Sequence, residues 1–171
     1  MEVSRASYRV AEYRPPEFLV DVNGPGGTLF AGDSLRATIE ARYLFGAPMA
    51  RAGVQWRAST SSLGWWGLEI PGLQAWDWYL GESGWWWEDD GDRDGEGVFA
   101  SGTDTLDASG RRNVRIALPA PPKGRATTVT LTAAITDVNR QSVAGSTSIV
   151  VHPADFYVAA KPLGASYFWR A

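Results

Sequence analysis

The stretch Ser34–Gly46, SLRATIEARYLFG, decides the fold class of this chain. Apolar side chains alternate in it with polar or charged ones, the period of two that is expected of a β-strand with one buried face. Such alternation is typical of antiparallel sheets, whose second face meets solvent. The residues expected to face inward are Leu35, Ala37, Ile39, Ala41 and Tyr43, and those expected to face outward are Arg36, Thr38, Glu40 and Arg42.

Several other segments alternate in the same way, and turn-forming residues separate them at 23–27, 45–48, 107–110, 119–124 and 137–141. No segment shows helical spacing with credible caps. The chain is therefore predicted to be all-β: an immunoglobulin-like, seven-stranded antiparallel β-sandwich. The expected inward residues of these other strands are Phe18, Val20, Val22, Val54, Trp56, Val114, Ile116, Leu118, Val129, Leu131, Ala133 and Ile135.

Particular roles are predicted for a few residues of these strands and turns. Trp56 is the best candidate for a core tryptophan between the two sheets. Asp104, Asp107, Asp137 and Asn139 are expected to cap turns through hydrogen bonds from side chain to backbone.

Composition excludes several classes of function. The chain has 171 residues, a net charge of −3 and no cysteine. The absence of cysteine excludes disulfides, thiolate metal sites and cysteine nucleophiles, and an acidic chain lacks the basic surface of a nucleic-acid binder. No apolar run approaches the length of a membrane span, and the first ten residues show no apolar core of an export signal.

Residues 63–98 do not fit the sandwich pattern and are predicted to be a long insertion rich in tryptophan and acid. They hold seven of the nine tryptophans. Trp85, Trp86 and Trp87 are interpreted as an interface, facing a neighbouring domain or packing on the sandwich, and a sugar-binding surface is a further alternative.

Asp90, Asp92 and Asp94, followed by a glycine, resemble the opening of a calcium loop. However, Ser101 stands at the twelfth position, where an EF-hand needs a bidentate glutamate. The alternative is a solvated acidic tip. Calcium is thus the one cofactor hypothesis, and no other cofactor is expected.

Catalysis is not expected. Glu69, Asp77, Glu82 and Glu88 lie near aromatic residues, but a glycosidase needs two carboxylates across a cleft, and one small sandwich offers little cleft. His152 is the single histidine, which cannot build a metal site alone and is expected to be structural.

The two ends of the chain resemble a known family. The segments YRVAEYRPPEFLVDV (8–22) and GDSLRATIEARYLFGAPMARAGVQWR (32–57) are similar to a boundary between macroglobulin domains of bacterial alpha-2-macroglobulins. The segment TDVNRQSVAGSTSIVVHPADFYV (136–158) resembles the closing hairpin of such a domain and the entry to the next.

This resemblance implies a domain organisation. Residues 1–14 would be the end strand of a preceding macroglobulin domain or a linker, 15–153 the sandwich itself, and 154–171 a linker or the start of the next domain. The partners implied are the neighbouring macroglobulin domains of the same chain.

The resemblance also implies a function for the whole protein: a periplasmic or cell-envelope inhibitor that entraps proteases, with membrane association only through the parent protein. This chain would be a non-enzymatic scaffold within it. The competing hypothesis is a stand-alone adhesion module whose segment 63–98 binds a glycan or calcium.

Overall fold

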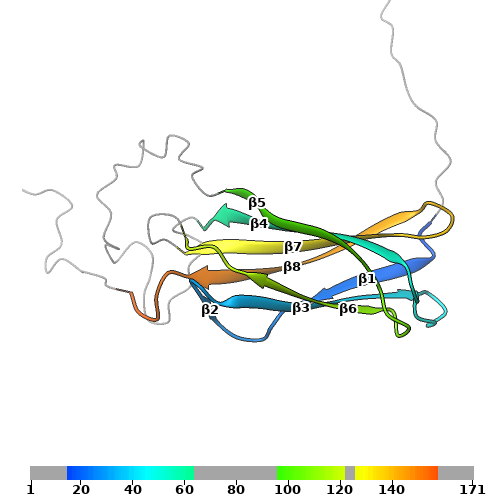
Figure 1. Cartoon of the computed structure of the whole chain (residues 1–171), viewed down its shortest axis with the longest axis horizontal. Helices are drawn as coiled ribbons and strands as arrows, with labels where there is room; N and C mark the ends of the chain where they lie inside the picture. The colour runs from blue at the N-terminus through cyan, green and yellow to red at the C-terminus, as the bar shows by residue number, and fades with distance from the viewer. Residues whose placement is uncertain (1–14, 64–95, 122–125, 158–171) are drawn as a thin grey trace, which may run out of the picture.

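The computed structural model describes residues 15–63, 96–121 and 126–157, and these ranges form an all-β sandwich (Figure 1). The predicted fold class is confirmed. No helix in the described ranges is long and apolar enough to cross a membrane. The strands are β1 (Phe18–Asn23), β2 (Leu29–Phe30), β3 (Ser34–Tyr43), β4 (Gly53–Ser62), β5 (Gly97–Thr105), β6 (Arg111–Ala117), β7 (Thr127–Thr136) and β8 (Ser142–His152).

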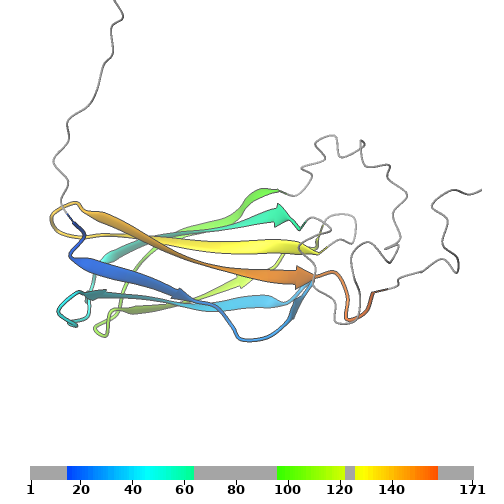
Figure 2. The same cartoon turned by 180° about the vertical axis from the view of Figure 1, so that it is seen from behind.

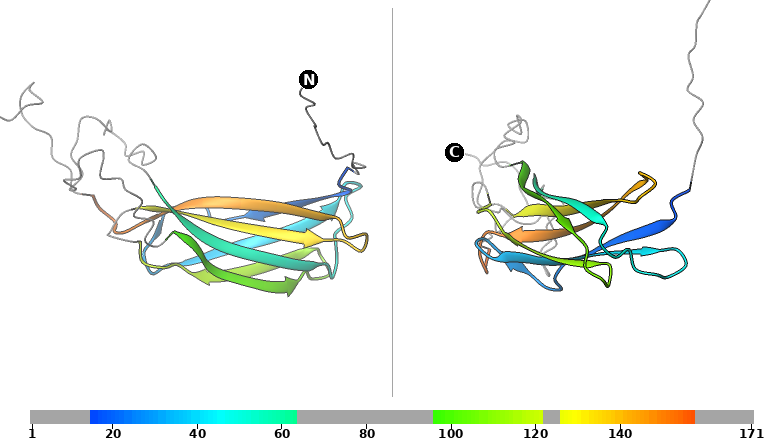
Figure 3. Two further views of the ribbon diagram at one scale, coloured as in Figure 1. Left: turned by 90° about the horizontal axis from the view of Figure 1, so that it is seen from above. Right: turned by 45° about the vertical axis from the view of Figure 1, so that its right-hand side comes forward.

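The strands form two sheets that lie face to face (Figure 3, left). Sheet A has the order β1-β3-β6, and sheet B has the order β2-β8-β7-β4-β5. All pairings are antiparallel except that of β2 with β8, which is parallel and joins Leu29–Phe30 to Val151–His152. The structure has eight strands where seven were expected, and the two-residue β2 is too short to show alternation.

The core lies between the inner faces of the two sheets, where the alternation placed it. Phe18, Leu35 and Ile39 of sheet A are fully buried against Leu131 and Ile135 of sheet B. Burying side chains of this size stabilises the fold by about 1.5–3 kcal/mol each. The other predicted inward residues are buried too, apart from Tyr43 and Trp56, which are half-buried at the margin of the core.

One edge of the sandwich is closed by a close approach of β1 to β8, seen as the blue and orange strands of Figure 2. At the crossing, a Cβ atom built on Gly145 would overlap with the carbonyl oxygen of Val20. Only glycine leaves enough room for the backbones of two sheets to come this close.

The opposite edge, between β5 and β6, is closed by a charge pair. Asp104 forms an ion pair with Arg112. The predicted hydrogen bond from side chain to backbone is present, because Asp104 Oδ1 accepts from Thr105 N at 2.8 Å, but Asp104 lies on β5 and not in a turn. Its register partner Val54 is buried, so its carboxylate is directed to the rim of the inner face, where Arg112 can reach it.

The alternation analysis missed β5 because its inner face has no apolar period. Ala100, Gly102 and Asp104 oppose Ala58, Trp56 and Val54 of β4, and a bulge interrupts the register next to Ala58. Gly97 and Val98 belong to this strand, so the predicted end of the insertion at residue 98 is wrong by two residues.

Trp56 packs against the core but is half-buried rather than enclosed between the sheets. A Cβ atom on Gly102, its partner on the edge strand β5, would lie 2.6 Å from Cζ2 of the indole. The ring thus lies over Gly102, at the margin of the core.

The β5–β6 turn is built around Asp107, as predicted. Its Oδ1 accepts hydrogen bonds from Ser109 N at 2.8 Å, Ser109 Oγ at 2.6 Å and Arg111 N at 3.0 Å. Asp137 plays the same part in the β7–β8 hairpin, where its Oδ1 accepts from Gln141 N at 2.8 Å. The hydrogen bond from the Ser109 hydroxyl, followed by that from the Arg111 amide, lowers the pKa of Asp107 below 3.8.

The β1–β8 crossing can be tested with Gly145→Ala. We expect it to lower the free energy of unfolding by about 1–3 kcal/mol, because the added methyl group forces the two sheets apart. Gly53→Ala is the matched control, since nothing lies within 4 Å of a Cβ atom there. Urea denaturation measures the free energy of unfolding of both variants. Equal values would contradict a close approach of β1 and β8 at Gly145.

The Asp107 turn can be tested by its pH dependence. Because the folded-state pKa is depressed, the stabilisation is fully present above pH 3.8 and is lost as the pH falls through the folded pKa. Asp107→Asn keeps an acceptor oxygen but does not titrate. Thermal melts between about pH 5 and about pH 2 should show the wild-type advantage over this variant shrinking as acid is added. A constant difference across this range would refute the role of the carboxylate.

Candidate functional site

The site residues predicted from the sequence lie outside the described residues. They are Asp90, Asp92, Asp94, Trp85, Trp86 and Trp87. Calcium binding by the three aspartates and an interface at the three tryptophans therefore stay predictions. The structure does describe the place on the sandwich where the segment between β4 and β5 begins and ends.

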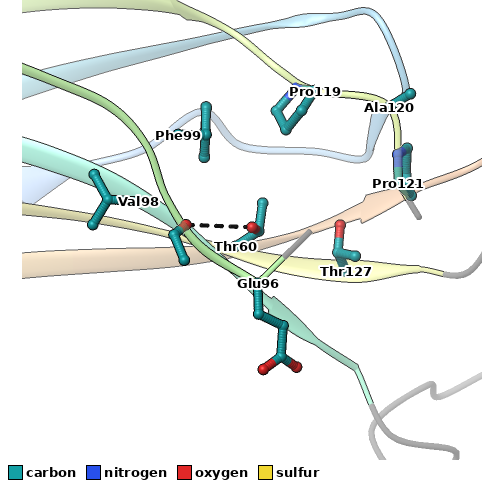
Figure 4. A pocket seen from close by; sticks show the side chains of 9 residues that line it. Thr60, Glu96, Val98, Phe99, Pro119, Ala120, Pro121 and Thr127 are labelled. Atoms are coloured by element: carbon teal, nitrogen blue, oxygen red, sulfur yellow. Dashed lines mark hydrogen bonds between the residues drawn. The ribbon is translucent and has the colours of Figure 1, made fainter. Parts of the chain in front are cut away.

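That place is a shallow hollow at one end of the sandwich (Figure 4). Ser62, at the end of β4, donates its backbone N–H to Glu96 Oε1 at 2.9 Å, and Thr60 Oγ1 donates to the carbonyl oxygen of Gly97 at 3.4 Å. These two bonds hold the ends of β4 and β5 together, so segment 64–95 leaves and returns at neighbouring points. The hollow has a volume of about 240 Å³ and is lined by Thr60, Glu96, Gly97, Val98, Phe99, Pro119, Ala120, Pro121 and Thr127.

The described lining of this hollow is mostly apolar. Phe99, Pro119 and Pro121 lie on one side of it, while Thr60 and Thr127 lie on the other (Figure 4). Glu96 is the single titratable residue among the described residues that line it, and a pair of carboxylates is what glycoside hydrolysis requires. In the three described ranges, no group of three or more His, Cys, Asp or Glu could hold a metal ion.

His152 fixes the path of the chain where it leaves the same end. Its Nδ1 lies 2.6 Å from the hydroxyl oxygen of Tyr157, and the two rings meet edge to face with centroids 5.8 Å apart. The ring of Phe30 in β2 also packs on His152, with the two ring centroids 6.1 Å apart. Burial raises the pKa of Tyr157 above its ordinary value of 10.0. Within the described residues, His152 thus has structural contacts, as the sequence suggested.

The other end of the sandwich exposes apolar side chains. Leu44 and Phe45, in the β3–β4 connection, are 63% and 79% exposed, and Val138 in the β7–β8 hairpin is 92% exposed. The ring of Phe45 stacks on Tyr43 with centroids 5.1 Å apart, so it is held outward rather than folded into the core. Exposed apolar side chains that gather on one end of a domain are typical of an interaction surface.

Sequence reasoning missed this end because Phe45 was assigned to the turn at 45–48 and Leu44, which precedes it, was given no role. The signal was present: two large apolar residues continue past the last inward residue, Tyr43, where a solvated turn would have polar ones.

No family model matches the chain. A curated protein, the alpha-2-macroglobulin homolog of Nostoc sp., is 27% identical to it over 164 residues. That match covers 94% of this chain and 8% of the relative, so the chain spans less than a tenth of the curated protein.

Solved structures agree in fold. The native conformation of Escherichia coli alpha-2-macroglobulin superposes with a TM-score of 0.66 at 17% identity, covering 91% of this chain and 9% of that one. Salmonella alpha-2-macroglobulin reacted with methylamine gives a TM-score of 0.66 at 18% identity, covering 85% of this chain and 9% of that one. In sequence and in fold, this chain is therefore similar to one domain-sized part of the bacterial alpha-2-macroglobulins, which confirms the resemblance to their macroglobulin domains.

Proposed function

We propose that this chain is a non-enzymatic macroglobulin domain, one structural unit of a larger alpha-2-macroglobulin-like protein that entraps proteases in the bacterial cell envelope. The observation that carries the proposal is the match along 94% of the chain to 8% of an alpha-2-macroglobulin homolog. A match that covers nearly all of one chain and a small part of the other is expected when one domain is compared with a long array of domains.

The course of the chain supports a place within such an array. β1 begins at one end of the sandwich, and β8 leads to the other end (Figure 1). A domain whose entry and exit lie at opposite ends can be joined to a unit before it and a unit after it without either connection crossing its faces.

The apolar end supports a contact with the preceding unit. Leu44, Phe45 and Val138 surround the end at which β1 begins, and Leu44 N donates to the carbonyl oxygen of Glu17 at 2.9 Å, which ties the β3–β4 connection to the entering chain. A domain joined there would cover these side chains, and interfaces between domains of one chain bury surface of this kind.

The competing hypothesis is a stand-alone module that binds glycan or calcium through segment 63–98, and most of that segment, residues 64–95, lies outside the described ranges. The comparisons favour the first hypothesis, because the sandwich matches alpha-2-macroglobulins along most of its length.

Entrapment can be tested on the full-length parent protein with trypsin and porcine elastase, the proteases that activated two of the similar Escherichia coli structures. We expect the parent to block hydrolysis of a large protein substrate while a small peptide substrate is still cleaved. An entrapped protease keeps its active site but excludes large substrates. Equal inhibition of both substrates, or of neither, would contradict entrapment.

The apolar end can be tested with the double variant Leu44→Ser and Phe45→Ser. We expect it to lower the melting temperature of the parent protein, with a loss of about 1–3 kcal/mol of stability per covered side chain. The isolated 171-residue chain, in which these side chains are already exposed, should melt unchanged. Leu19→Ser is the control, since Leu19 is 45% exposed on the outer face of sheet A. A parent protein that melts as before would show that this end is not covered, even if entrapment holds.

A further inference from the structure

Two arginines oppose each other on the outer face of sheet A. Arg36 of β3 and Arg115 of β6 are direct partners in the register, and both side chains are exposed. Directly opposed residues on one face of a sheet have Cβ atoms about 5 Å apart, and like charges in that position destabilise the pair of strands. The sequence thus places a local electrostatic cost at this point of a stable sheet.

The other charged residues on this face have partners of opposite sign. Arg111 Nε lies 3.1 Å from Glu40 Oε2, and Arg42 Nη2 lies 3.7 Å from Asp21 Oδ2. Across residues 15–63, 96–121 and 126–157, by contrast, neither Arg36 nor Arg115 takes part in an ion pair or a side-chain hydrogen bond. The opposed pair is the exception to the charge pairing of its own sheet.

The next outward-facing row adds another donor beside the two guanidinium groups. Thr38 Oγ1 donates to Asn113 Oδ1 at 2.8 Å, which occupies the amide oxygen and leaves the NH₂ group of Asn113 to donate. This part of the face therefore offers N–H donors from Arg36, Arg115 and Asn113. Guanidinium groups match planar carboxylates with paired hydrogen bonds.

We infer that the outer face of sheet A at Arg36, Asn113 and Arg115 is a docking surface for carboxylate groups of an acidic protein partner. A carboxylate between the two guanidinium groups replaces their repulsion with attraction. Two isolated arginines fit one or two discrete carboxylates, whereas binding nucleic acid requires a longer basic patch or stripe. This inference rests on the register and the ion pairs alone and does not depend on the proposed function.

The repulsion can be measured on the 171-residue chain. At low ionic strength, Arg36→Gln and Arg115→Gln should each raise the melting temperature by about 1–2 °C, because each removes one of two opposed like charges. Arg57→Gln is the matched control: Arg57 is also exposed, but its register partners Ser101 and Thr132 are neutral. A melting temperature that stays the same or falls in the two variants would overturn the inference.

Docking can be measured by titrating the ¹⁵N-labelled chain with hexaglutamate and following its NMR spectrum. We expect saturable shifts at Arg36, Asn113 and Arg115, and binding about threefold to fivefold weaker in Arg36→Gln or Arg115→Gln but unchanged in Arg57→Gln. A glycine–serine peptide of the same length should cause no shift. Hexaglutamate shifts that persist in both variants, or shifts caused by tripolyphosphate but not by hexaglutamate, would overturn the assignment to an acidic protein.

Discussion

The sandwich depends on the crossing of β1 and β8, where the carbonyl oxygen of Val20 occupies the space that any side chain at position 145 would need. This contact holds the edge of the three-stranded sheet against the five-stranded one, so Phe18, Val20 and Val22 complete the core from that side. At the opposite edge, Asp104 of β5 forms an ion pair with Arg112 of β6. The two sheets are thus joined by a close steric fit at the β1–β8 edge. At the β5–β6 edge, where β5 has small residues on its inner face, they are joined by an ion pair.

Alternation predicted most of this fold because the fold is a half-buried antiparallel sandwich, the case in which burial repeats every second residue. Leu35, Ile39, Leu131 and Ile135 were identified from that period alone. The same reasoning failed where the period is absent. β2 is too short to show it, and β5 replaces apolar residues with Gly102, which makes room for Trp56, and Asp104, which serves the edge. At Gly102 and Asp104, packing and charge pairing therefore replace the alternation of apolar and polar residues.

The surfaces of the molecule were harder to predict than its core. Conspicuous composition drew attention to Trp85–Trp87 and the aspartates that follow them, which lie outside the described residues. The surfaces that the structure describes are made by residues of ordinary appearance. Arg36 and Arg115 are 79 positions apart, and only the pairing of β3 with β6 shows that they are opposed. Leu44 and Phe45 lie in the β3–β4 connection and Val138 lies in the β7–β8 hairpin, and both connections are at the same end of the sandwich (Figure 1).

The opposite positions of entry and exit have a mechanical consequence. β1 and β8 run in the same direction along neighbouring edges of the two sheets, one starting where the chain enters and the other ending where it leaves (Figure 2). Tension applied to the two ends pulls these strands past each other along their length. The ladder between β1 and β3 is then loaded in shear, with its hydrogen bonds sharing the force rather than opening one after another. A sandwich loaded in this way resists stretching along its axis, because the hydrogen bonds of this ladder must break together.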